Sequence, residues 1–390
     1  MHSPKSCDEL LVEMVGFDTV NAAISGRTAP ESPLAEFLAT YAERLGFVVT
    51  RLPVDGFSFN VMVSYRIRAD APWLLFESHL DTVSADNMII DPFSGRISEG
   101  RVFGRGACDT KSSGAAMLTA LTAYRAGVHQ PNNVAVLYTA DEEIGKTGIR
   151  AFVNQSLHTL DFRPAGAIVG EPTGLRPVVA HNGIVRWCIR TKGVAAHSSD
   201  PRKGRSAITM MVNVIQAMES QYIPRLSASH PLTGSARCSI NVIRGGTQVN
   251  MIPDACRIEI DRRVVPGENP QDVLPAVERL LDRLRQENPD LQVQQDPPFI
   301  DPPLDTRGNE AFIAFVQSAL SAMSMPHEAG GGAYGTDASS FGEALIPAVV
   351  LGPGNIEQAH AENEWITLDQ LQSAVDVYLR LMCQPLENAI

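Results

Sequence analysis

The chain has 390 residues, of which 44% are hydrophobic and 19% are charged, and its formal net charge is -12. A chain of this length exceeds the size at which one hydrophobic core usually stops growing, so we expect two domains that fold without disulfide cross-links. The negative charge and the absence of any Lys and Arg cluster argue against nucleic acid and anionic membranes as partners.

The first 17 residues predict an amphipathic helix, because Asp8, Glu9 and Glu13 interrupt what would otherwise be an apolar signal-peptide core. No run in the chain approaches the roughly 20 apolar residues of a membrane span. The six cysteines are scattered and form no Cys-x-x-Cys pair, which is typical of buried thiols in a reducing compartment. We therefore expect a soluble, cytoplasmic protein.

Three apolar, β-prone runs end in residues that can bind metal ions. The runs are 73–76 before His79 and Asp81, 134–138 before Asp141-Glu142-Glu143, and 167–169 before Glu171. Continuous apolar runs separated by helical segments such as 113–126 indicate a mainly parallel sheet buried on both faces, which is an α/β fold. Ligands of such sheets bind beyond the carboxyl ends of the strands, so we expect these polar residues to converge.

The segment 181–295 has a different pattern, with a strand, a helix, two strands and a second helix. This order predicts an inserted α+β domain of the ferredoxin-like kind. The apolar run 348–351, followed by His360, returns the chain to the main sheet. We therefore expect one domain formed by residues 1–180 and 296–390, and a second formed by 181–295.

His79 and Asp81 are two residues apart, so in an extended strand both side chains point the same way, and one can bind a metal while the other supports it. A surface His beside a helix-capping Asp would have the same spacing. Asp109 follows a Gly-rich turn at the start of a helix, where its carboxylate could bridge two cations. It could equally be an acidic residue favoured by the helix dipole.

Glu142 and Glu143 would repel each other at a strand end unless cations or protons compensate their charges. One could bind a metal ion while the other takes a proton from a bound water, although an exposed Glu-Glu pair is usually solvated surface. With Glu171 and His360, the candidate ligands are two His, one Asp and two Glu, with one Glu unliganded. This set fits two divalent ions about 3.5–4 Å apart, with Zn²⁺ favoured and Co²⁺ or Mn²⁺ as alternatives.

The sequence resembles the co-catalytic zinc metallopeptidases that include acetylornithine deacetylase, succinyl-diaminopimelate desuccinylase, aminoacylase and glutamate carboxypeptidase. The resemblance covers essentially the whole chain, and its motifs are 78–83 (SHLDTV), 104–111 (GRGACDTK), 141–145 (DEEIG), 170–173 (GEPT) and the segment around His360. It implies the zinc-peptidase-like fold, with 181–295 as a lid and dimerisation domain.

The resemblance also implies a role for each site residue. His79 and Glu171 would hold one metal ion, Glu143 and His360 the other, and Asp109 would bridge both. Glu142 would be the general base, and Asp81 would orient His79.

In the inserted domain, the motif 193–198 resembles the one whose His, here His197, reaches the active site of the partner subunit in a homodimer and helps to stabilise the oxyanion. Asn250 and Arg263 match positions that recognise the substrate, and Gly335 and Thr336 resemble a substrate-contacting turn. Arg262 could take the place of Arg263, because strand register decides which of the two points inward. An Arg suits a carboxylate because its planar fork can donate two parallel hydrogen bonds.

Two features depart from the family pattern: Ser112-Ser113 stands where Gly is common after Lys111, and Thr110 stands where Met is common. The implied activity is removal of an N-acyl group from an amino acid. The alternatives are a dipeptidase or carboxypeptidase with the same site, and a catalytically silent metal-binding relative. A serine hydrolase is disfavoured because no Gly-x-Ser-x-Gly elbow precedes a helix.

Overall fold

The structure is a computed structural model that describes residues 4–386. Residues 1–3 and 387–390, which we expect in the main domain, lie outside the described residues. The chain forms two compact units. The first consists of the residues up to Val179, Thr306–Gly330 and the residues from Thr336 onward, and the second consists of Ala180–Asp305 and Gly331–Gly335.

The main sheet has eight strands in the order β1-β2-β6-β3-β7-β19-β8-β18. In that order the strands are Val48–Pro53, Phe59–Tyr65, Asn133–Thr139, Trp73–His79, Pro164–Val169, Ala348–Val350, Val178–His181 and Gly330–Gly332. The central strands β6, β3, β7 and β19 pair in parallel, whereas β1 with β2, β2 with β6, and β19 with β8 pair antiparallel. The expected α/β fold with a mainly parallel sheet is confirmed.

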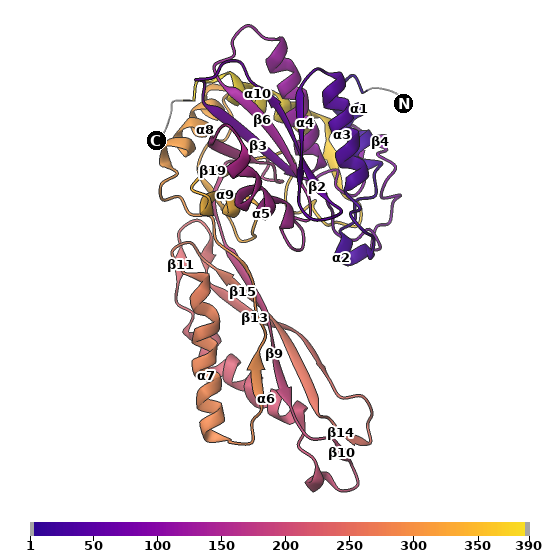
Figure 1. Ribbon diagram of the computed structural model, residues 1–390, viewed down its shortest axis with the longest axis vertical. Helices are drawn as coiled ribbons and strands as arrows, with labels where there is room; N and C mark the ends of the chain where they lie inside the picture. Colours follow the sequence, from indigo (N-terminus) through magenta and orange to yellow (C-terminus); the bar gives the residue numbers. More distant parts are fainter. Residues whose placement is uncertain (1–3, 387–390) are drawn as a thin grey trace. The chain divides into compact units, whose positions relative to one another are not determined.

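Helices cover both faces of this sheet (Figure 1). One face shares a core with α1 (Cys7–Val15), α3 (Ser32–Arg44), α4 (Lys111–Ala126), α8 (Glu310–Ala322) and α10 (Leu368–Cys383). The helices α5 (Thr147–Asn154) and α9 (Ala338–Glu343) contact each other and the strands from outside that core. In β3, Leu74 and Phe76 belong to the first core and Leu75 between them does not, as the alternation of a strand requires.

The start of helix α4 lies against the carboxyl end of β3. The helix is rich in Ala, the strongest helix former, and it packs against α1, α10 and the sheet. Its first residues, Lys111, Ser112 and Ser113, are fully buried. The Ser112 hydroxyl donates to the carbonyl of Cys108, so the turn before α4 is held by this serine.

The smaller elements of the first unit lie outside the main sheet. They are the short helix α2 (Ala22–Ser25), the 3-10 helix Ser156–Thr159 and a three-stranded sheet in the order β20-β5-β4, with strands Trp365–Thr367, Arg101–Phe103 and Ile97–Ser98. None of the helices formed by residues 4–386 has both the length and the apolar character needed to cross a bilayer.

The second unit contains an antiparallel sheet in the order β13-β15-β9-β16, with β17 also paired to β9. In that order the strands are Arg237–Gly245, Ala255–Val264, Gly183–Lys192, Val293–Gln295 and Phe299–Asp301. The helices α6 (Ala207–Ala217) and α7 (Val273–Glu287) share a buried core with β9 and β15. Two short ribbons pair β10 (Ala196–His197) with β14 (Met251–Ile252) and β11 (Ser229–His230) with β12 (Gly234–Ser235).

Candidate metal centre

Three neighbouring parallel strands bring the candidate ligands to one edge of the main sheet. Strand β3 ends at His79, β6 ends at Thr139 just before the acidic turn 141–143, and β7 ends one residue before Gly170-Glu171. Because β6 and β7 flank β3 in parallel register, their carboxyl ends lie together. The predicted convergence of these three strand ends is present in the structure.

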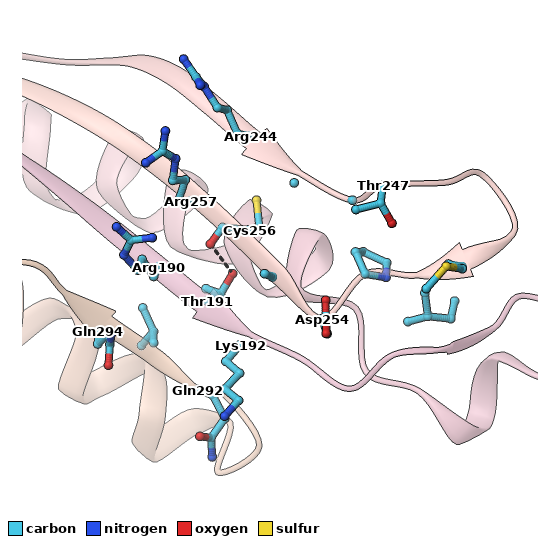
Figure 2. Close-up of a pocket in the computed structure, with 17 residues that line it drawn as sticks. Arg190, Thr191, Lys192, Arg244, Thr247, Asp254, Cys256, Arg257, Gln292 and Gln294 are labelled. Atoms are coloured by element: carbon cyan, nitrogen blue, oxygen red, sulfur yellow. Dashed lines mark hydrogen bonds between the residues drawn. The ribbon is translucent and has the colours of Figure 1, made fainter. Parts of the chain in front are cut away.

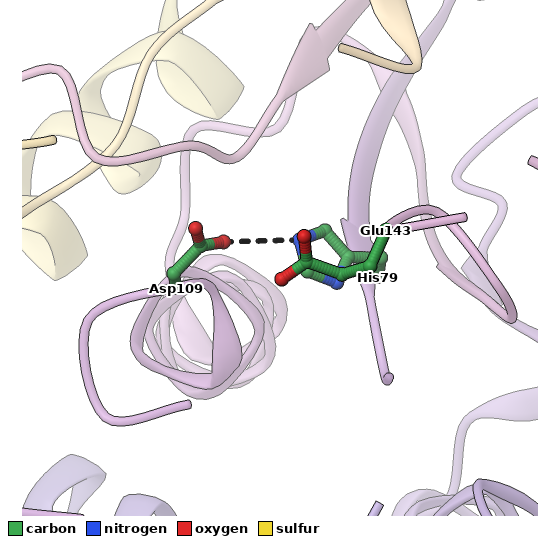
Figure 3. A group of neighbouring side chains, drawn as sticks. All are labelled: His79, Asp109 and Glu143. Atoms are coloured by element: carbon green, nitrogen blue, oxygen red, sulfur yellow. Dashed lines mark hydrogen bonds and ion pairs between the residues drawn. The ribbon is translucent and has the colours of Figure 1, made fainter. Parts of the chain in front are cut away.

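Asp109 lies between the two candidate imidazole ligands. Its Oδ1 is 3.1 Å from His79 Nε2, and its Oδ2 is 3.4 Å from His360 Nε2. His360 Nε2 is also 3.2 Å from Glu143 Oε1, and His79 Nε2 is 3.8 Å from Glu171 Oε1. Figure 3 shows the Asp109 carboxylate directed at the His79 ring, with Glu143 beside it. Each oxygen of one carboxylate therefore faces a different imidazole.

The electrostatics of this cluster suit cations. Burial and the negative charge of Asp109 raise the pKa of Glu143 to about 7, and the same causes raise the pKa of Glu171 well above its usual range. Hydrogen bonds to Asp109 and Glu143 raise the pKa of His360 to about 10. The ionised forms of Glu143 and Glu171 are therefore disfavoured at this buried site unless positive charge compensates them, as divalent ions would.

The donor set has the chemistry of a two-cation site. Ligand atoms of His79, Asp109 and Glu143 lie within 4.8 Å of one another, and so do those of His79, Glu142 and Glu171. Imidazole and carboxylate together suit borderline divalent ions such as Zn²⁺. The residues therefore fit a metal centre.

Glu142 lies beside the cluster, is largely buried, and pairs with Lys146. Its Oε1 lies 3.4 Å from Nζ of Lys146, one turn further along the chain, and both side chains are at most 10% exposed. Burial raises the pKa of Glu142, and the positive charge of Lys146 opposes that shift. A carboxylate with a raised pKa is suited to accept and return a proton near neutral pH.

Asp81 holds both His79 and the acidic turn. Nδ1 of His79 is 3.0 Å from the Asp81 carbonyl oxygen and 3.5 Å from its carboxylate, so the backbone makes the closer contact. The Asp81 carboxylate accepts hydrogen bonds from the backbone N–H groups of Glu142 at 2.8 Å and Glu143 at 3.1 Å. Asp81 thus aligns residues from two strand ends, His79 mainly through its backbone carbonyl and the acidic turn through its carboxylate.

Two residues that sequence reasoning missed support this arrangement. Asn21 donates from Nδ2 to the carboxylates of Asp81 and Asp141, at 2.8 Å in each case. Glu364 is fully buried and accepts from the backbone N–H of Asp109 at 3.0 Å, while it pairs with Arg105 at 2.7 Å. Asn21 carries no signal in the sequence, whereas Glu364 stands in the same short acidic segment as His360.

A second buried acidic pair adjoins the end of β6. The Thr139 hydroxyl lies 2.6 Å from Glu77 Oε1 and 3.3 Å from Asp337 Oδ2, and both carboxyl groups are buried. Burial raises the pKa of Glu77 to about 7 and that of Asp337 well above its usual value. The sequence signal for Glu77 is an acidic residue in a strand, directly after the apolar run 73–76.

His197 and Asn250 are neighbours in the second unit. His197 is exposed in β10 and lies opposite Met251 of β14, and its Nδ1 is 2.8 Å from the Ser199 hydroxyl. The carbonyl of Asn250 accepts a hydrogen bond from the backbone N–H of Ser198. An exposed imidazole held by its own loop is free to contact another molecule.

The remaining predicted substrate residues have different environments. Arg262 is buried and pairs with Glu268 at 2.7 Å, whereas the side chain of Arg263 is 29% exposed and pairs with Asp261 at 2.7 Å. Gly335 belongs to the second unit, and an added Cβ there would lie 2.8 Å from the Asp301 carboxylate. Thr336 is buried in the first unit. Arg263 is therefore the arginine of the pair that solutes can reach.

Comparison with known proteins gives consistent matches along nearly the whole chain. The profile of peptidase family M20/M25/M40 matches residues 75–384. Acetylornithine deacetylase of Myxococcus xanthus is 30% identical over 373 residues, covering 93% of this chain and 92% of the relative. Acetylornithine deacetylase of Proteus mirabilis is 29% identical over 391 residues, covering 97% and 96%. An M20 family metallo-carboxypeptidase from Sulfolobus solfataricus has a similar fold, with a TM-score of 0.81, 18% identity, and coverage of 97% and 99%.

Proposed function

The chain belongs to peptidase family M20/M25/M40 and is a hydrolase of amide bonds, and from this premise we propose that it removes the N-acyl group from an amino acid. Substrates of the N-acetylornithine or N-succinyl-diaminopimelate kind fit the proposal, because two relatives that match more than nine tenths of the chain are acetylornithine deacetylases. The observation that carries the proposal is the Asp109 carboxylate, whose two oxygens face His79 and His360 separately.

We propose that two divalent ions, Zn²⁺ first and Co²⁺ or Mn²⁺ as alternatives, are held by this cluster. His79 and Glu171 would hold one ion, Glu143 and His360 the other, and Asp109 would bridge them. The separate orientation of the two Asp109 oxygens supports this division. Such ions would lower the pKa of a water molecule and polarise the amide carbonyl.

Glu142 would act as the general base. It is unliganded in this assignment, lies largely buried next to Lys146, and has a raised pKa. Its carboxylate would take the proton from the attacking water and deliver it to the leaving amine. Asp81 would keep His79 and the backbone of the acidic turn in place while this occurs.

The second unit would act as a lid and dimerisation domain in a homodimer. His197 would reach the active site of the partner subunit and stabilise the oxyanion, a role that its exposure supports. Asn250 and Arg263 would recognise the substrate's polar groups with the turn Gly335-Thr336. The free state of all six cysteines supports a cytoplasmic location.

A dipeptidase or carboxypeptidase is the second candidate function. The proposed ligands and the base would serve a peptide bond unchanged, and the fold is shared with a metallo-carboxypeptidase. The two candidates differ in the groups that surround the scissile bond, so substrate tests separate them.

The test is hydrolysis of a panel of N-acetyl, N-succinyl and N-formyl amino acids together with dipeptides, by zinc-loaded enzyme with and without a chelator. We expect chelator-sensitive release from the acyl set. Cleavage of dipeptides alone would assign the enzyme to the peptidases. Release that the chelator leaves unchanged would contradict the metal mechanism.

A further inference from the structure

Three arginines form a row across the sheet of the second unit. Arg244 of β13 lies directly opposite Arg257 of β15, and Arg257 lies directly opposite Arg190 of β9. The row continues in Gln294 of β16, which lies opposite Arg190. Residues directly opposite in antiparallel strands share a face of the sheet. Figure 2 shows the three guanidinium groups on the same side of three adjacent strands.

The opposite face of the same strands is apolar and covered. Ile189 and Ile258, which neighbour Arg190 and Arg257 along their strands, are fully buried in the core with α6 and α7. The helices therefore cover the apolar face of the sheet, and the arginine row lies on the opposite face.

Nearby carboxylates compensate the row only in part. Arg190 pairs with Asp296 at 2.6 Å and Arg257 with Glu259 at 3.1 Å, and the members of both pairs are between 25% and 45% exposed. Exposed ion pairs contribute little to stability. Within the part of the chain that the structure describes, no carboxylate pairs with Arg244. Like charges directly opposite each other destabilise a sheet, so the row has a cost for folding that a bound anion would remove.

The row lines a hollow of about 660 Å³ that lies wholly within the second unit. Its charged lining residues are Arg190, Lys192, Arg244, Arg257 and Asp254, and with the paired carboxylates of Asp296 and Glu259 included, four cations stand against three carboxylates. The protein as a whole has a net charge of -12, whereas the charge balance around this hollow is positive. The volume is within the range of small-molecule sites.

We propose that this hollow, the arginine-row site, binds a small anion with several negatively charged oxygen groups, of the oligophosphate or polycarboxylate class. Adjacent strands are about 4.8 Å apart, so the three guanidinium groups are spread along the row. They can therefore donate paired hydrogen bonds to several charged groups of one extended anion. The side chains of Gln294 and Thr247 add neutral hydrogen-bonding groups to the lining. This site has no residue in common with the candidate metal centre.

Binding can be measured with naphthalene trisulfonate, because sulfonates are weak ligands for divalent metal ions and the metal centre will not compete for them. Fluorescence titration of the metal-loaded protein at low ionic strength should give saturable binding. Arg257→Gln, at the centre of the row, should weaken binding by at least about tenfold. Arg279→Gln is the matched control, because this exposed arginine lies on α7, which covers the other face.

Tripolyphosphate and citrate are each titrated into the wild type and into Arg257→Gln. For each anion, the difference in affinity between the two proteins measures binding at the row, and comparing the two anions distinguishes phosphate from carboxylate recognition. Absence of saturable trisulfonate binding, or equal weakening by Arg257→Gln and Arg279→Gln, would overturn the proposal.

Thermal unfolding gives an independent readout. Without anion, Arg257→Gln should unfold at the wild-type temperature or above it, because the repulsion in the row is relieved. With trisulfonate, the wild type should become the more stable of the two. A variant that is less stable in both conditions would make Arg257 a structural residue and contradict the proposal. Sedimentation velocity must show the same association state for both proteins, since a change would assign the row to an interface between copies of the chain.

Discussion

Glu142 is the side chain on which the proposed chemistry depends most directly. Replacing it with Gln keeps the size and removes the group that accepts the proton. We expect kcat of Glu142→Gln to fall by about 10² to 10⁴, the range for loss of a general base, while the bound metal stays at the wild-type amount. Steady-state kinetics and metal analysis on the same sample check this. Glu310→Gln, at an exposed position on α8, is the control. Full activity with full metal would remove Glu142 from the mechanism.

Glu31 makes the stability of the protein depend on pH. This buried residue precedes α3, and burial, followed by the negative charges of Asp81 and Asp141, raises its pKa from 4.5 to about 7. A raised folded-state pKa means that the native state favours the protonated form. The stability from this group is therefore fully present below about pH 4.5 and is lost as the pH rises to about 7.

We expect Glu31→Gln to gain stability over the wild type as the pH rises through this window, by on the order of 3 kcal/mol in total. Chemical unfolding at about pH 5 and about pH 8 measures the difference. Glu36→Gln on the same helix is the control, since its hydrogen bond with Arg51 lowers the pKa of Glu36 below 4.5, so that its contribution to stability does not change between about pH 5 and about pH 8. A difference for Glu31→Gln that does not change with pH would show that the carboxyl group is not perturbed in solution.

At the scale of elements, Glu364 joins the turn before α4 to the segment that carries His360. Its Oε1 accepts from the backbone N–H groups of Cys108 and Asp109, its Oε2 pairs with the buried Arg105, and its own carbonyl accepts from Gly104. The two loops that present Asp109 and His360 are thus fixed to each other by one residue.

Glu364→Gln should destabilise the protein by about 3 kcal/mol or more, because it leaves the buried charge of Arg105 unpaired. Metal affinity should also fall, since Asp109 and His360 would lose their relative position. Thermal unfolding and competition with a chromogenic chelator measure the two effects. Glu362→Gln, two residues away and exposed, is the control. Equal metal affinity of the two variants would limit Glu364 to a structural role.

The strand ends are the part of the site that the sequence predicts well. An apolar run followed by His79, Glu142 or Glu171 identifies both the strand and the edge at which its last side chains lie, because neighbouring parallel strands end together. The contacts of Asn21 and Glu364 could not be predicted in this way. Asn21 meets Asp81 across 60 positions and Glu364 meets Arg105 across 259, and loop segments carry no periodic pattern that would indicate such pairs.

The way in which the Gly-rich segment is divided between the two units could not be predicted from the sequence pattern either. The Gly-rich segment divides between them, with Gly331–Gly335 in the second unit and Thr336 in the first. Sheet pairing explains the division, since the backbone N–H of Asn182 donates to the carbonyl of Gly332. A short glycine strand has no side chains from which its partner could be predicted.

At the scale of the whole molecule, the proposed homodimer predicts that an active site takes Glu142 from one subunit and His197 from the other. Glu142→Gln and His197→Ala should each have low activity alone. Mixed and reassociated in equal amounts, they should recover up to about one quarter of wild-type activity, since half of the dimers are mixed and each of those has one intact site.

The double variant Glu142→Gln/His197→Ala is the control for this experiment. Mixed with His197→Ala, it supplies subunits that can exchange but no intact His197, so no site can regain both groups. Recovery in the first mixture alone would therefore require His197 to act across the subunit boundary. If the first mixture recovers nothing although native mass spectrometry shows mixed dimers, His197 acts within its own subunit or has no part in turnover, and the exposed β10 loop must then serve some other contact.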